Sequence, residues 1–75
     1  MAVVVCQRWT LDGVESGFSL HRDAETADLF CASPVGTPEG AVPSHRSSVE
    51  VELHVYSPLK EETGVWYPGV ERLLI

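Results

Sequence analysis

The chain has 75 residues, the size of one small domain, and its 11 acidic residues against five Lys and Arg give a net charge of −6. Because it has no cluster of basic side chains, direct binding to nucleic-acid phosphates or to an anionic membrane is disfavoured. A domain this small is marginally stable, which argues against strained catalytic groups, and no stretch approaches the roughly 20 apolar residues that cross a bilayer. We expect a cytoplasmic protein whose charge either keeps it soluble or attracts a basic partner.

The first two predicted elements form a β-hairpin. Residues 2–11 are rich in valine, which is typical of a strand, and they lack the basic leading region of a signal peptide. Asp12-Gly13 is a strong signal for a two-residue turn, and residues 14–21 form the predicted return strand.

The two-residue turn also predicts a pairing register for this hairpin. Trp9 would face Ser16 and Gln7 would face Phe18, which gathers most of the apolar side chains on one face of the hairpin. Gly17 marks either a bulge near the turn or a close approach by another segment.

Residues 23–32 are a predicted helix. Asp23 is a good N-cap, and Glu25 lies in the first turn, where the helix dipole favours an acid. Asp28 adds a third carboxylate, and Leu29 lies with Glu25 away from the apolar side of the helix. Leu29 is either an isolated exposed residue or an anchor for a partner. The apolar side consists of Ala24, Ala27, Phe30 and Cys31.

Residues 33–47 are rich in proline and glycine, a composition that resists helix and sheet alike. This segment is predicted to be a loop, either a surface connection or a binding loop. Cys6 and Cys31 are most simply two buried free thiols, with a bridge between them as the alternative. His21, Cys31 and His54 lack zinc-site spacing, so no metal is predicted.

Residues 48–56 alternate apolar and polar side chains, which predicts a strand with one apolar and one acidic face. Glu50 and Glu52 would lie about 7 Å apart on the acidic face. Two carboxylates in that relation either perform acid–base chemistry or bind calcium, or they form a solvated acidic surface. We favour the solvated surface, joined to the acids of the predicted helix, because so short a chain makes no deep cleft.

The remaining residues predict short elements. Ser57-Pro58 predicts the start of a brief helical segment, and residues 65–67 predict a strand that ends at Pro68-Gly69. Trp66 and Tyr67 are typical of binding hot spots and of small cores, and on a strand one would be buried and the other exposed. The apolar residues 73–75 would either complete the sheet or bury against a partner subunit.

No catalytic motif accompanies these elements. The chain lacks a G-x-S-x-G elbow, and its Gly36–Gly40 stretch lacks the lysine and the following helix of a phosphate-binding loop. Cys31 on the apolar side of a helix is a poor position for an exposed thiolate. The chain is therefore predicted not to be an enzyme and to need no cofactor.

Three stretches together resemble small acidic proteins encoded by bacteriophages and other mobile elements. They are residues 17–22 with the acidic helix that ends at Phe30, residues 43–46, and the Val-Glu-Val-Glu strand. The resemblance implies a context in which such a protein binds and blocks a host complex, for example a CRISPR effector or a polymerase. The basic channels of such complexes accept an acidic surface.

The sequence thus predicts an α+β fold, an antiparallel sheet of three or four strands with one helix packed on one face. The predicted function is non-catalytic binding and inhibition of a host complex with a basic surface. The alternative is a structural module that acts as a homodimer through its apolar tail and sheet edges. The predicted partner-binding residues are Asp23, Glu25, Asp28, Leu29, Glu50, Glu52, Trp66 and Tyr67.

Overall fold

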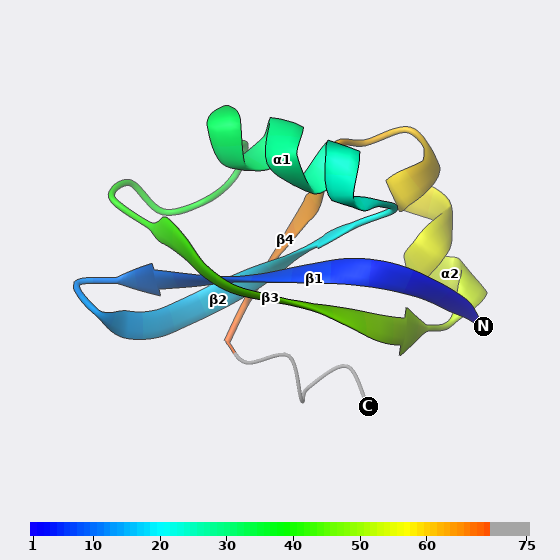
Figure 1. The fold of residues 1–75 in the computed structure, drawn as a ribbon, viewed down its shortest axis with the longest axis horizontal. Coiled ribbons are helices and arrows are strands. Elements are labelled where there is room, and N and C mark those ends of the chain that lie inside the picture. Colours follow the sequence, from blue (N-terminus) through cyan, green and yellow to red (C-terminus); the bar gives the residue numbers. More distant parts are fainter. Residues whose placement is uncertain (70–75) are drawn as a thin grey trace.

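The computed structural model describes residues 1–69. Its four strands form one antiparallel sheet in the order β3-β1-β2-β4, and helix α1 covers one face of it (Figure 1). The predicted α+β class is confirmed. No helix among residues 1–69 is long and apolar enough to span a membrane. In chain order the elements are β1 (Ala2–Leu11), β2 (Val14–His21), α1 (Ala24–Ala32), β3 (Val42–Val51), α2 (Leu53–Tyr56), the 3₁₀ helix η1 (Ser57–Lys60) and β4 (Val65–Pro68).

The hairpin β1–β2 has the predicted bounds and the predicted turn. Asp12 and Gly13 have φ angles of 54° and 80°, so both occupy the left-handed region. A two-residue turn of this kind matches the right-handed twist of the flanking strands, and glycine and aspartate tolerate its backbone. Leu11 and Val14 pair directly across it, as expected.

The register beyond the turn differs from the prediction by one residue. A bulge inserts Ser16, so that Trp9 pairs with Gly17 and Gln7 pairs with Ser19. One extra residue moves every later side chain of β2 to the other face. Phe18 therefore leaves the face that carries Trp9, and the predicted single apolar face of the hairpin is wrong.

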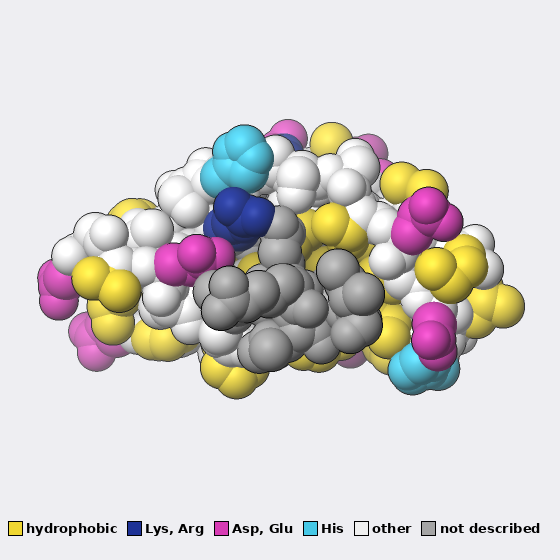
Figure 2. All heavy atoms as spheres, turned by 90° about the horizontal axis from the view of Figure 1, so that it is seen from below, with side chains coloured by type: hydrophobic (Ala, Val, Ile, Leu, Met, Phe, Trp, Pro, Cys, Tyr) yellow, Lys and Arg dark blue, Asp and Glu magenta, His cyan; other side chains and the backbone are white. Residues whose placement is uncertain are grey.

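Both faces of the sheet consequently carry buried side chains. On the face beneath α1, Trp9 packs edge-on against Phe30 with ring centroids 6.0 Å apart. On the opposite face, Leu59 of η1 is fully buried against the strands. Figure 2 views the protein from the side away from α1 and shows hydrophobic side chains there too. The buried core of this second face consists of Val4, Cys6, Phe18, Leu20, Val51 and Leu59.

Helix α1 begins as predicted at the N-cap Asp23. The Thr26 backbone N–H donates to Asp23 Oδ1 over 2.9 Å, and the Asp23 backbone N–H donates to Thr26 Oγ1 over 3.3 Å. This reciprocal capping box satisfies two backbone donors that a helix start leaves without partners. The Thr26 backbone N–H also holds the pKa of the Asp23 carboxyl below its ordinary value.

Strand β3 lies earlier in the chain than predicted. It pairs with β1 from Val42 opposite Thr10 to Val51 opposite Ala2, so the partner strand sets its length. The predicted loop over residues 33–47 is wrong in its second half, and the predicted strand is wrong beyond Val51, where α2 follows. Strand β3 can contain Pro43, which lacks a backbone N–H, because an edge strand uses only half of its backbone N–H groups for pairing within the sheet.

Strand β4 confirms the predicted strand at residues 65–67 and pairs with β2 at the other edge of the sheet. The helical segment that precedes it begins earlier than predicted, at Leu53, and η1 carries Pro58 in its first turn. The predicted roles of residues 73–75 lie outside the described residues.

Candidate functional site

A chain of buried hydrogen bonds runs beneath α1. Trp9 Nε1 donates to Ser19 Oγ over 2.8 Å, and Ser19 Oγ lies 2.7 Å from His21 Nε2. His21 Nδ1 lies 2.6 Å from the carbonyl oxygen of Thr63. Because a carbonyl only accepts, Nδ1 carries the proton, and the Ser19 hydroxyl donates to Nε2. The contacts therefore select one neutral tautomer of His21.

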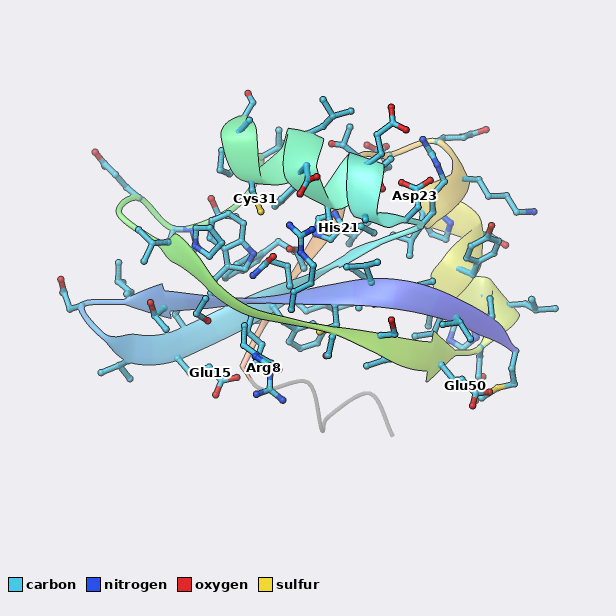
Figure 3. All side chains as sticks on the ribbon, in the orientation of Figure 1. Arg8, Glu15, His21, Asp23, Cys31 and Glu50 are labelled. Carbon is cyan, nitrogen blue, oxygen red and sulfur yellow. The ribbon has the colours of Figure 1, made fainter. Side chains whose placement is uncertain are left out.

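The Ser19–His21 contact has the spacing of a nucleophile and its base, but it is sealed from solvent. Both residues are 0% exposed, and Figure 3 shows His21 between α1 and the sheet. Burial lowers the pKa of His21 against the opposing effect of the Thr63 carbonyl. The network joins β1, β2 and the segment before β4, which is a structural role. The sequence alone could place Ser19 and His21 on one face of β2, because side chains alternate along a strand. It could not show that they are buried, because α1 covers them.

A second polar cluster holds α1 against β1 and β3. Arg46 Nη1 lies 2.9 Å from Asp28 Oδ1, and Arg46 Nε donates to Gln7 Oε1 over 2.8 Å. Arg46 Nη2 lies 3.9 Å from Cys31 Sγ. The hydrogen bond to Asp28 raises the pKa of Arg46 above its ordinary value. Asp28 therefore has a structural contact, although its side chain remains 71% exposed.

The two cysteines are free, as predicted, and the alternative of a bridge between them is wrong, but only Cys6 is buried, whereas Cys31 is half-buried. Cys6 is buried on the face away from α1, whereas Cys31 lies on α1 over the other face. His21, Cys31 and His54, which lack zinc-site spacing, lie on three different elements, β2, α1 and α2. No group of three potential ligands among residues 1–69 is placed to hold a metal ion.

The predicted acidic residues fall into separate groups. Asp23, Glu25 and Asp28 share α1, whereas Glu50 lies on β3 and Glu52 is the N-cap of α2. The prediction that the two glutamates share a strand face is wrong, because the strand ends between them. Figure 3 shows Asp23 at the start of α1, well apart from Glu50, and acidic side chains are scattered over the view in Figure 2. The predicted continuous acidic surface is therefore divided.

The two aromatic residues of β4 contact the core. Trp66 packs edge-on against Trp9 with centroids 6.1 Å apart, and Tyr67 stacks on Phe18 at 5.2 Å. They point to opposite faces, as predicted, but both are partly buried, so the prediction that one is exposed is wrong. Their packing contributes to stability, since each ring covers one face of the neighbouring strand β2.

No protein-family model, curated protein or solved structure matches this chain. The outward side of α1 is the feature that combines several predicted binding residues on one element. Leu29 is 55% exposed there, beside the exposed acids Glu25 and Asp28. We refer to Asp23, Glu25, Asp28 and Leu29 as the α1 outer surface.

Proposed function

We propose that this chain is a non-catalytic binding protein that docks through the α1 outer surface on a basic region of another protein. The observation that carries the proposal is an exposed leucine on a helix that carries three exposed carboxylates. A central apolar anchor surrounded by polar contacts is the usual organisation of a binding surface. The capping box and the Arg46 contact hold this helix in a defined position for binding.

Electrostatics would supply the first stage of binding. The net charge of −6 attracts a basic surface over roughly a Debye length, and opposite potentials raise association rates. Contact of Leu29 with an apolar depression on the partner would then slow dissociation. The two stages respond differently to mutation, because removing a charge mainly changes association whereas removing an anchor mainly changes dissociation.

A binding role also agrees with the use of the polar side chains. Ser19 and His21 would be the natural catalytic pair, but their hydrogen bonds are made to Trp9 and Thr63 inside the protein. The carboxylates, in contrast, lie at the surface. In an enzyme the opposite arrangement is usual, with reactive groups lining a cleft and the remaining charges solvated.

The proposed partner is a host assembly that handles nucleic acid, such as a CRISPR effector or a polymerase, and the proposed effect is inhibition. Such assemblies have grooves lined by Lys and Arg that bind phosphates, and clustered carboxylates can compete for them. This class of partner is the one that a resemblance of the sequence to small acidic phage proteins would imply. Glu50 and Glu52 lie away from α1 and would contribute only to the overall field.

The test is a quantitative pull-down from a lysate of bacterial host cells, with the retained proteins identified by mass spectrometry. We expect the wild-type chain to retain a nucleic-acid-handling complex, less of it at higher salt, and we expect Leu29→Ser to abolish retention. Glu25→Gln should reduce retention, whereas Glu39→Gln, an exposed acid in the α1–β3 loop, should not. Equal retention by Leu29→Ser and the wild-type chain, both folded by circular dichroism, would contradict the proposal.

A further inference from the structure

No other described strand pairs with the outer edge of β3. Among residues 1–69, β3 has only β1 as a neighbour, and its residues 42–46, 48 and 50 are exposed. Every second residue of an edge strand directs its backbone N–H and C=O away from the sheet, where another strand can pair with them. The register of β3 against β1 shifts between Pro43 and Arg46, so the regular part of this edge is residues 46–51, which contain no proline.

The charges on this edge are arranged symmetrically about Ser48. Arg46 and Glu50 lie two residues on either side of it and point to the same face, because side chains alternate. If two copies of β3 pair in antiparallel fashion about a two-fold axis at Ser48, each Arg46 lies opposite Glu50 of the second copy. Opposite charges directly across a strand pair stabilise the pairing, and the symmetry makes this contact twice.

We propose that β3 pairs with β3 of a second copy of this chain in this register, so that the two sheets become one continuous sheet. The two-fold axis is perpendicular to the sheet, so α1 of both copies lies on the same face. The predicted alternative of a homodimer thus acquires a specific interface. Its pairing contacts come from β3 alone, although Arg46 also contacts Asp28 of the α1 outer surface.

The neighbouring registers lack this complementarity. An axis at Ser47 would place Glu50 opposite Ser44, and an axis at Val49 would place Arg46 opposite Glu52, which lies beyond the end of β3. With the axis at Ser48, Pro43 faces residue 53 of the second copy, where that strand has already ended. Its missing N–H then removes no hydrogen bond from the new ladder.

Arg46 can accept the additional carboxylate. A guanidinium has five N–H donors, and the contacts with Asp28, Gln7 and Cys31 use three of them. Its side chain is 35% exposed. Glu50 is exposed and makes no ion pair with any other of residues 1–69. The arrangement would place Arg46 between a carboxylate of its own chain and one of the second copy.

Cysteine cross-linking tests the register. In a Cys31→Ser background, Ser48→Cys places two thiols opposite one another across the axis, within the Cα separation that a disulfide needs. Ser44→Cys is the matched control, because the two copies of residue 44 would lie about 26 Å apart, eight residues of strand. With oxidised glutathione we expect a cross-linked dimer for Ser48→Cys only. Equal cross-linking at both positions, or none at residue 48, would overturn the proposal.

Charge exchange tests the pairing without covalent chemistry. Sedimentation equilibrium should show a dimer for the wild-type chain, and Glu50→Arg should raise its dissociation constant by about tenfold or more, because two attractive contacts become repulsive. Arg46→Glu should do the same, and an equimolar mixture of the two variants should regain a dimer. Circular dichroism confirms folding of each, since Arg46→Glu also removes contacts within the chain. A wild-type chain that stays monomeric, or a dimer unaffected by Glu50→Arg, contradicts the inference.

Discussion

Substitution of Gly17 by alanine tests how closely β4 packs against β2. The φ angle of Gly17 is outside the left-handed region, so alanine can adopt its backbone conformation without strain. In a strand, alanine is normally favoured over glycine by about 0.5–1 kcal/mol. A Cβ at this position, however, would overlap the ring of Trp66 and lie only 2.6 Å from the carbonyl oxygen of Tyr67. We therefore expect Gly17→Ala to destabilise the protein.

The magnitude follows from which atoms can move. Overpacking a filled site costs about 1–3 kcal/mol. The Trp66 ring can rotate, but the Tyr67 carbonyl is backbone, and its movement displaces β4 from β2. We therefore expect a loss of about 2–3 kcal/mol from a total of about 4–11 kcal/mol for a domain of this length. With a urea m-value of about 1.5 kcal/mol/M, the unfolding midpoint should fall by about 1–2 M.

Urea unfolding followed by far-UV circular dichroism and by tryptophan fluorescence measures this loss. Near-UV circular dichroism should change as well, because the edge contact between Trp9 and Trp66 is disturbed. Gly36→Ala is the control, since a Cβ there meets no atom within 4 Å and only its φ of 80° carries a cost. The near-UV spectrum of the control should remain that of the wild-type chain.

A double-mutant cycle with Trp66→Leu separates the two obstacles at Gly17. If the ring carries part of the cost, Gly17→Ala should cost less in the Trp66→Leu background, and the remaining cost reports on the Tyr67 carbonyl. A Gly17→Ala protein that equals or exceeds the wild-type stability would refute the reasoning, because it would show that β4 does not approach β2 so closely.

Two further predictions concern Leu59 and His21. Leu59→Ala should lower the free energy of unfolding by about 2–5 kcal/mol, because the Leu59 side chain is fully buried. Leu59→Met should lower it by less than about 1.5 kcal/mol, because methionine has a similar volume. Thermal unfolding distinguishes the two variants, and equal losses would contradict this account. Burial lowers the pKa of His21 in the folded protein, so the unfolded chain binds the proton more readily. The contribution of neutral His21 to the free energy of unfolding should be present above about pH 6.5, the ordinary histidine pKa, and should be lost as the pH drops through the lower pKa of His21 in the folded protein. His21→Gln should flatten this profile between about pH 7.5 and pH 5, and an unchanged slope in His21→Gln would exclude His21 as the cause.

Several elements were predictable because their signals are local. The Asp12-Gly13 turn depends on the backbone freedom of two adjacent residues, and the start of α1 depends on contacts within four residues of Asp23. The α1 outer surface was predictable for the same reason, since helical spacing alone places Leu29 with Glu25. These features require no knowledge of what the rest of the chain does.

The bulge and the bounds of β3 were not predictable in this way. The bulge at Ser16 changes which face carries Phe18, and the close contact of Gly17 comes from β4, about 50 residues further along the chain. The Val-Glu-Val-Glu alternation favours a strand that continues through Glu52. In the structure, however, the pairing of β3 with β1 ends at Val51, which lies opposite Ala2, the first residue of β1. The supposed pair of strand glutamates therefore depended on the length of a different strand.

The amino-acid sequence by itself determined the hairpin turn, the capped helix, the acidic balance and the presence of four strand-forming segments. Only the tertiary structure decided which side chains are buried, because burial depends on what packs against each face. Trp66 and Tyr67 became partly buried against the core when β4 paired with β2, and Ser19 and His21 became a sealed network when α1 covered them. Local propensity acts within a few residues, whereas burial is settled by contacts between segments that are distant in the chain.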